Sequence, residues 1–328
     1  MNRKRNLFGV AALAFGMLVA VLSALPGHGQ SVTAQQEERT SDVRPAVKLT
    51  ADIKERTAPA ATSSTGTAFS TAAARNVSLR SSLAWAFGGK QQRGWYLYTA
   101  MINNTLGTES DASSDDFAHA LSRWQEQTGL APTGVLDNDT WTKMFSAWQA
   151  RRLKERAYPS PEQLVTAPAS DFWDESRPAE LRQVEREAYA AYKRMVAAAA
   201  ADPSLRLATT ADGQLAPAEK YLKIISAFRS RAYQEQLRKA SPNSGTAGLA
   251  RNSPHFTGRA LDIYVGGEPV ETKDANRAVQ VQTPAYKWLV RNAERFGFRP
   301  YYYEPWHWEY VGTNAAATQQ APTAPHTH

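Results

Sequence analysis

The alternation of apolar and polar positions divides the chain into stretches of different character. Three basic residues at positions 3–5 come first, followed by an apolar stretch over residues 7–25 and a polar flank that opens with Pro26. This order predicts an export signal over residues 1–30. The apolar stretch would also form a helix of about 28 Å, long enough to remain in a membrane. Cleavage of the signal and its retention as an inner-membrane tether through residues 7–25 therefore both stay open.

Three further stretches lack the apolar periodicity that a buried core requires. Residues 31–80 are rich in Ala, Thr, Ser and charge, and residues 313–328 are similarly poor in apolar side chains. Such compositions predict a disordered linker and a disordered tail. Residues 151–177 are rich in charge and proline, so we interpret them as a connector between two folded domains.

Helical patterns fill residues 83–150, which also hold five of the nine tryptophans. Apolar residues recur there at i, i+4 and i+7: Phe117, Leu121 and Trp124. Asp115 or Asp116 is expected to cap this helix, and Asp137 or Asn138 the last one. The stretch therefore predicts a small all-α domain of three short helices.

The C-terminal third combines one long helical pattern with short alternating stretches. Residues 180–201 predict an Ala-rich amphipathic helix with an apolar stripe of Val184, Ala188, Ala191, Met195 and Ala198. Residues 260–265 and 306–311 alternate in character as strands do. Asp262 is therefore expected on the strand face opposite to Leu261, and His307 on the face opposite to Trp308. We therefore expect an α+β domain over residues 178–312.

Composition and charge exclude several classes of function. The chain has 328 residues and no cysteine, so it contains no disulfide framework, thiolate zinc finger, iron–sulfur cluster or cysteine nucleophile. Any metal must be held by His, Asp or Glu. The net charge is +7, of which the basic residues at 3–5 supply three, and the small remaining surplus argues against nucleic acid as a partner.

Two of the six histidines lie in motif-like surroundings, each with a carboxylate close by. His255 precedes Asp262 and its strand, with Gly258 allowing a tight approach, and Glu304 precedes His307 by three residues. Two histidines and one aspartate fill three positions of a tetrahedral zinc and leave the fourth to water. A nearby glutamate that is not a ligand can act as general base. On these residues alone, core or surface histidines with incidental acids remain an alternative explanation.

The flanking residues narrow this choice. SPHFTGRALD, residues 253–262, and EPWH, residues 304–307, resemble the paired signatures S-x-H-x-x-G-x-A-x-D and E-x-W-H of VanY-type zinc D-Ala-D-Ala carboxypeptidases. That family shares its fold with the Hedgehog signalling domain. The resemblance implies a Hedgehog/DD-peptidase-like fold with one zinc per catalytic domain. It also implies His255, Asp262 and His307 as the zinc ligands and Glu304 as the catalytic base.

A third signature supports the same resemblance. The family's G-Y-R-S-x-x-x-Q motif reads AFRSRAYQ in residues 227–234, with Arg229 and Gln234 in register. The resemblance implies that Arg229 steadies the substrate in catalysis and that Arg229, Gln234 and Ser253 contact it. Ser253 could instead cap the turn before Pro254. Arg251 and Arg259 are equally basic neighbours that could bind a substrate carboxylate, and the sequence does not choose among the arginines.

The N-terminal helical stretch has its own resemblance. FAHALSRWQEQTGLAPTGVLDNDTWTKM, within residues 95–148, is similar to the three-helix peptidoglycan-binding domain found beside many wall hydrolases. His119 in this stretch has no partner histidine at helical spacing, so we expect it to be no ligand. Peptidoglycan and its stem peptides are the expected partners.

Together these features predict an exported peptidase of the periplasm or the cell wall. Its expected reaction removes the terminal D-Ala from D-Ala-D-Ala. The alternatives are an endopeptidase of the L-Ala-D-Glu type and a non-catalytic wall-binding protein. The sequence leaves the oligomeric state and the physiological role open.

Overall fold

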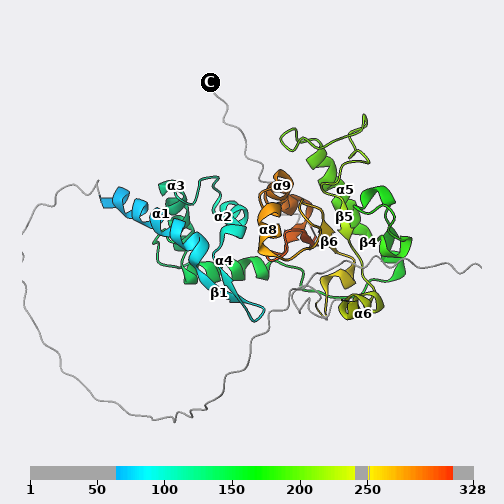
Figure 1. Ribbon diagram of the computed structural model, residues 1–328, viewed down its shortest axis with the longest axis horizontal. Helices are drawn as coiled ribbons and strands as arrows, with labels where there is room; N and C mark the ends of the chain where they lie inside the picture. The colour runs from blue at the N-terminus through cyan, green and yellow to red at the C-terminus, as the bar shows by residue number, and fades with distance from the viewer. Residues whose placement is uncertain (1–63, 241–249, 251, 313–328) are drawn as a thin grey trace, which may run out of the picture. The chain divides into compact units, whose positions relative to one another are not determined.

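The structure is a computed structural model that describes residues 64–240, 250 and 252–312 (Figure 1). The expected signal over residues 1–30, the first part of the expected linker and the expected tail over residues 313–328 lie outside this range. Among the helices of the described residues, none combines the length and the apolar character needed to cross a membrane.

Residues 64–150 form a mostly helical body, which we call the N-terminal module. Its elements are α1 Ser64–Ser82, β1 Ala84–Phe87, β2 Lys90–Arg93, η1 Tyr96–Tyr98, α2 Thr99–Leu106, α3 Asp115–Gln127 and α4 Asn138–Ala150. The side chain of Ser114 caps α3, one residue before the expected aspartates, and that of Asp137 caps α4 as expected. The helical character expected for residues 83–150 is confirmed, and a short hairpin accompanies it.

The linker expected over residues 31–80 is wrong in its last part, because residues Ser64–Ser82 form helix α1. The side chain of Asn76 is fully buried, donates to Gly134 O at 2.8 Å and accepts from Leu136 N at 2.8 Å. Ala72 and Ala73 are buried beside it. The helix is therefore stabilised by docking against the turn that follows α3 rather than by an apolar stripe of its own. Periodicity in the sequence could not reveal it for this reason.

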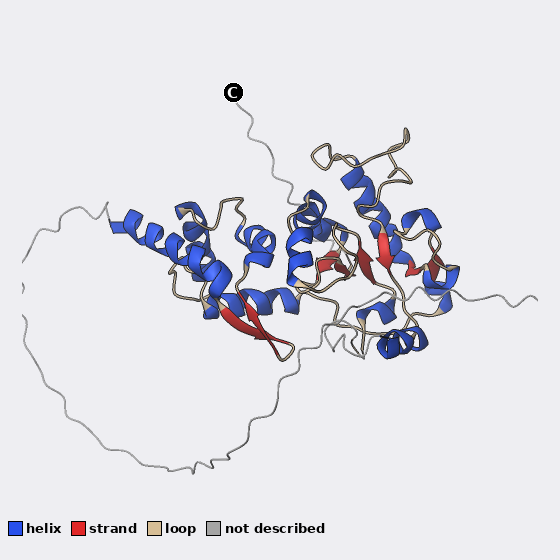
Figure 2. Cartoon of the chain, viewed as in Figure 1, coloured by secondary structure: helices blue, strands red, loops and turns tan. Residues whose placement is uncertain are grey.

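The remaining elements form what we call the C-terminal domain, residues 161–312, which mixes helices and strands (Figure 2). They are η2 Pro161–Gln163, β3 Leu164–Thr166, η3 Ala169–Asp171, η4 Ala179–Leu181, β4 Gln183–Glu185, α5 Arg186–Ala200, β5 Ile224–Ser226, α6 Arg231–Ala240, η5 Pro254–Thr257, β6 Ala260–Ile263, α8 Asp274–Gln280, α9 Pro284–Asn292, η6 Ala293–Phe296, β7 Phe298–Pro300 and β8 His307–Tyr310.

The long helix expected over residues 180–201 begins later than expected. Residues Gln183–Glu185 pair as strand β4 with Leu164–Thr166 of β3, and the side chain of Glu185 then caps α5 by accepting from Ala188 N at 2.9 Å. Part of the expected connector thus contributes a strand. The helical stripe still holds from Ala188 onward, because Ala188, Ala191 and Met195 are buried.

Asp262 and His307 lie on a four-stranded antiparallel sheet in the order β5-β6-β8-β7. Asp262 on β6 lies directly opposite Ser226 on β5 and His307 on β8. Leu261 and Trp308, which alternate with these residues, are buried in the hydrophobic core. The alternation expected from the sequence therefore places polar groups on one sheet face and apolar ones on the other.

Aromatic side chains join the N-terminal module to the C-terminal domain. Tyr302, two positions before the glutamate of the EPWH motif, has its ring centroid 4.5 Å from that of Phe145 and 5.2 Å from that of Phe87. Arg277 of α8 donates to Tyr98 Oη at 2.8 Å. The tyrosines at 301–303 all have ring contacts with Phe87 of the module.

Candidate active site

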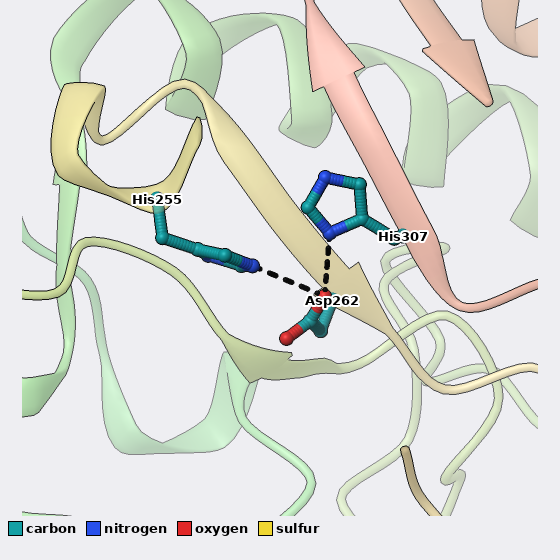
Figure 3. Close-up of side chains that lie close together, drawn as sticks. All are labelled: His255, Asp262 and His307. Atoms are coloured by element: carbon teal, nitrogen blue, oxygen red, sulfur yellow. Dashed lines mark hydrogen bonds and ion pairs between the residues drawn. The ribbon is translucent and has the colours of Figure 1, made fainter. Parts of the chain in front are cut away.

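Three elements bring the expected ligand residues together (Figure 3). His255 lies in η5, where Gly258 closes the turn with a φ of +68° and where any Cβ would meet Glu185 N at 2.9 Å. Asp262 is central in β6, and His307 is the first residue of β8. Because antiparallel partners directly opposite each other share a sheet face, Asp262 and His307 meet across the ladder.

The donor atoms of these residues form a tight buried cluster. His255 Nε2 lies 3.3 Å from Asp262 Oδ1, and His307 Nδ1 lies 3.0 Å from the same oxygen. Ligand atoms of all three residues lie within 4.8 Å of one another, and each residue is at most 3% exposed. Two imidazoles and one carboxylate at this spacing can hold a divalent metal ion.

Each imidazole has its second nitrogen occupied by a different partner. His255 Nδ1 lies 2.7 Å from Ala227 O, and His307 Nε2 lies 3.3 Å from Glu309 Oε1. A metal-binding histidine characteristically donates its other N–H to a carbonyl or carboxylate, which fixes the ring and its tautomer. The other two ring nitrogens, Nε2 of His255 and Nδ1 of His307, both lie against Asp262 Oδ1. The arrangement therefore fits a metal site in its outer contacts as well as in its ligands.

Burial and charge shift the pKa values of these groups in opposite directions. Burial and the nearby Arg229 lower the pKa of His255 to about 4. Burial also acts to lower the pKa of His307, but hydrogen bonds to Asp262 and Glu309 raise it to about 9. For Asp262, the effect of burial is outweighed by His255, His307 and Arg229, which hold the pKa well below its usual range.

Glu304 lies beside the cluster without belonging to it. Tyr301 N donates to His307 O and His307 N donates to Glu304 O, both at 2.9 Å, so the loop doubles back on itself. Glu304 Oε2 consequently lies 3.9 Å from His307 Nδ1, and the residue is 7% exposed. Burial raises the pKa of Glu304 to about 7, although His307 acts in the opposite direction. A carboxyl with that pKa can exchange protons near neutral pH.

Arg229 lies beside the same cluster, where it contacts Asp262, one of the candidate metal ligands. Its Nη2 donates to Asp262 Oδ2 at 2.6 Å, and its Nε donates to Ser226 Oγ at 2.9 Å. Gln234 lies next to Arg229, because Arg229 Nη1 lies 3.5 Å from Gln234 Oε1. The other side-chain atom of Gln234, Nε2, donates to Ala250 O at 3.2 Å. Both residues belong to the stretch where β5 passes into α6: Arg229 lies between the two elements and Gln234 lies on α6.

Ser253 is buried and takes the role that the sequence left as the alternative. Its side chain caps η5 by accepting a hydrogen bond from His255 N at 3.3 Å. The residue is 3% exposed. Ser253 therefore fixes the turn that carries His255, one of the candidate metal ligands.

Arg259 and His119 have partners that do not belong to the cluster. Arg259 is paired with Glu185 at 3.6 Å and with Glu187 at 3.3 Å. His119 is exposed on α3, and its Nδ1 lies 2.6 Å from Arg123 Nη1. Arg251 lies outside the described residues.

Sequence reasoning missed Glu309. It follows His307 by two positions on β8, so the same alternation that placed His307 on the polar face places Glu309 there as well. Its carboxylate is fully buried and contacts the ring of His307. The signal was present in the strand period, but the acid lies outside the quoted motif.

Comparison with known proteins confirms the resemblance. Residues 181–313 match the family model of VanY, D-alanyl-D-alanine carboxypeptidase, and residues 94–144 match that of a putative peptidoglycan binding domain. No curated protein matches the chain. The C-terminal domain therefore contains a VanY-type region and the N-terminal module a peptidoglycan-binding region, as the resemblance implied. The VanY-type region indicates a peptidase or carboxypeptidase that acts on peptidoglycan, which suggests a function associated with the cell wall.

Proposed function

We propose that this protein is an exported zinc metallopeptidase that removes the terminal D-Ala from peptidoglycan stem peptides ending in D-Ala-D-Ala. The observation that carries the proposal is the convergence of His255, Asp262 and His307 beside the buried Glu304, within a VanY-type domain. Two nitrogens, one oxygen and a non-ligand carboxylate are the set that metal-assisted peptide hydrolysis uses.

His255, Asp262 and His307 would hold the metal, and their donor types favour zinc. When bound, zinc supplies a Lewis acid that polarises the scissile carbonyl and lowers the pKa of water. Glu304 then acts as the proton carrier. Its carboxylate takes the proton from the attacking water and passes it to the leaving amine of the terminal D-Ala. Burial favours this role because it raises the pKa of Glu304 to about 7, close to the working pH.

Arg229 is the proposed substrate-orienting cation. The leaving D-Ala carries a free carboxylate, and a buried guanidinium recognises such a group strongly. Arg229 is 9% exposed and already engages Asp262 Oδ2, so its more weakly bound Nη1 is the nitrogen we assign to the substrate. Gln234 and Ser253 remain proposed substrate contacts.

The division of labour follows the two matched regions. We propose that residues 83–150 bind peptidoglycan and that residues 178–312 cut it, with one zinc in the latter. Binding by a module without chemistry of its own raises the local concentration of stem peptides at the catalytic residues. Residues 1–30 would direct export to the periplasm or the cell wall, either as a cleaved signal or as a retained membrane tether.

Product identity tests the proposal. Purified protein loaded with zinc is incubated with a muropeptide pentapeptide, beside a Glu304→Gln variant, and the products are followed by mass spectrometry. We expect the loss of one alanine in the wild type only. Cleavage inside the stem would replace the proposal with the endopeptidase, and the absence of turnover with zinc bound would favour a non-catalytic wall-binding protein.

A further inference from the structure

Glu309 is a fully buried carboxylate with an unusual set of partners. Its Oε1 lies 3.3 Å from His307 Nε2, the ring nitrogen that faces away from Asp262. The side chain has no exposed surface. A buried carboxylate is costly unless charge and hydrogen bonds compensate it. The compensation here comes from a distant part of the chain.

The two residues that supply it lie directly beyond the end of the N-terminal module. Arg152 Nη2 donates to Glu309 Oε1 at 2.5 Å, and its Nε lies 3.3 Å from Oε2. The backbone N of Leu153 donates to the same Oε2 at 2.8 Å. Both oxygens of Glu309 are therefore held, and they are held by residues about 157 positions away in sequence.

Arg152 is itself held in place. Its guanidinium lies 3.8 Å from the ring centroid of Tyr301, and its side chain is only 16% exposed. Arg152 follows α4 after one residue, so its position depends on where that helix ends. A planar guanidinium that meets a carboxylate through two nitrogens restricts the carboxylate in orientation as well as in distance.

These contacts form a continuous path from the end of α4 to a ligand residue. Arg152 and Leu153 fix Glu309, Glu309 accepts from His307 Nε2, and the ring of His307 is thereby turned so that Nδ1 faces Asp262. Outer partners of this kind commonly account for a 10- to 100-fold difference in metal affinity.

We propose that Glu309 and Arg152 are positioning residues for His307, so that the segment following the N-terminal module completes the metal site of the C-terminal domain. This inference rests on the proposed function, because it assumes that His307 binds the metal. It assigns to the start of the connector a role that a simple tether between two domains would not have.

The test measures zinc affinity in the full chain by competition with a chromophoric chelator. We expect Glu309→Ala to weaken zinc binding by about 10- to 100-fold and Glu309→Gln by less, since the amide keeps an acceptor of nearly the same shape. Arg152→Ala should weaken it by about tenfold, with partial rescue in Arg152→Lys. The matched control is Tyr98→Phe, which removes another hydrogen bond between module and domain without touching His307.

A spectroscopic readout separates positioning from general destabilisation. With cobalt in place of zinc, Glu309→Gln should shift the visible absorption bands, whereas Tyr98→Phe should leave them unchanged. Unaltered zinc affinity and an unaltered cobalt spectrum in folded Glu309→Gln would overturn the inference. A His307→Ala variant keeps the two proposals distinguishable: if it binds zinc as tightly as the wild type, the proposed metal site itself is wrong.

Discussion

The core of the N-terminal module and the candidate active site are equally buried, but the first is stabilised by apolar packing and the second by paired charges. The module core is built from large apolar side chains, among them Trp95 and Trp141 at 0% and 2% exposure. The site is built from charges, among them Asp262 and Glu309 at 1% and 0%. Burial of apolar surface is favourable by itself, whereas each buried charge requires a partner.

This difference predicts how well each of the two regions tolerates substitutions. An apolar core needs approximate volume and periodicity, which neighbouring residues supply. A buried charge cluster needs partners at defined distances, and here these come from separate elements: Asp262 from β6, Arg229 from the β5–α6 junction and Arg152 from beyond α4. The site should therefore lose function through small polar changes that the module would tolerate.

Glu304→Gln should have the largest effect. The amide occupies nearly the same volume but cannot accept the proton, so we expect kcat to fall on the order of 10²- to 10⁴-fold. Zinc content should stay at the wild-type level because Glu304 is not among the proposed ligands. D-Ala release and metal analysis on the same sample test this. Activity above a tenth of the wild type would remove Glu304 from its assigned role.

Trp141→Ala should affect stability and leave the metal alone. The side chain is 2% exposed and packs against Trp85, Tyr98 and Trp148. Deleting it should lower the free energy of unfolding by about 3–5 kcal/mol, measured by denaturant titration, with Trp141→Phe as the milder control. The zinc affinity of the folded protein should not change. A loss of zinc affinity above tenfold would show that the core of the module and the active site are not independent in this respect.

Zinc binding should depend on pH through His307. Its pKa in the metal-free protein is about 9, above the usual 6.5, so below pH 9 a proton must leave before the ring can bind metal. The apparent zinc affinity should rise by about tenfold per pH unit between pH 7 and 9. Calorimetry in buffers of different ionisation enthalpy should find about one proton released per zinc near pH 7.5. Zinc binding without proton release would refute this.

The same shift predicts the pH dependence of stability without metal. A histidine whose pKa is higher in the folded state than in the unfolded state stabilises the fold fully below the unfolded value of 6.5. That stabilisation is lost as the pH rises through about 9. Thermal unfolding of chelator-treated protein, wild type against His307→Ala, measures it. A wild-type advantage that grows between pH 7 and 9 would contradict the assignment.

His119→Ala should have the smallest effect. The residue is exposed on α3 and lies far in sequence from the proposed ligands. Exposed substitutions of this kind change stability by less than about 0.5 kcal/mol. Zinc stoichiometry and D-Ala release should equal those of the wild type. Loss of zinc in this variant would show that a histidine of the module binds metal.

The sequence predicted what depends on local periodicity. The cap of α4, the burial of Ala188, Ala191 and Met195, and the strand faces that Asp262 and His307 take relative to Leu261 and Trp308 all follow from residues close together in the chain. The motifs then named candidate metal ligands whose donor atoms the structure brings within 4.8 Å of one another. The alternation of residues alone identified the polar strand faces of Asp262 and His307. The resemblance to the VanY-type family then implied that these residues bind a metal.

The sequence could not predict contacts that depend on tertiary docking. Helix α1 has no apolar stripe, and Asn76 is held by a turn about 60 residues away. Strand β4 interrupts a helical pattern because β3 pairs with it. Arg152 meets Glu309 only because the segment after α4 lies against β8. Each case joins residues whose separation in sequence leaves no periodic signal.

Reconstitution with zinc tests the central claim most directly. Metal-free protein is titrated with zinc while D-Ala release from a muropeptide pentapeptide is measured. We predict that the rate rises from near zero and reaches its plateau at one zinc per chain, and that Asp262→Asn shows neither tight binding nor activity. Full activity in the metal-free wild type, or an unchanged zinc titration in Asp262→Asn, would contradict the account.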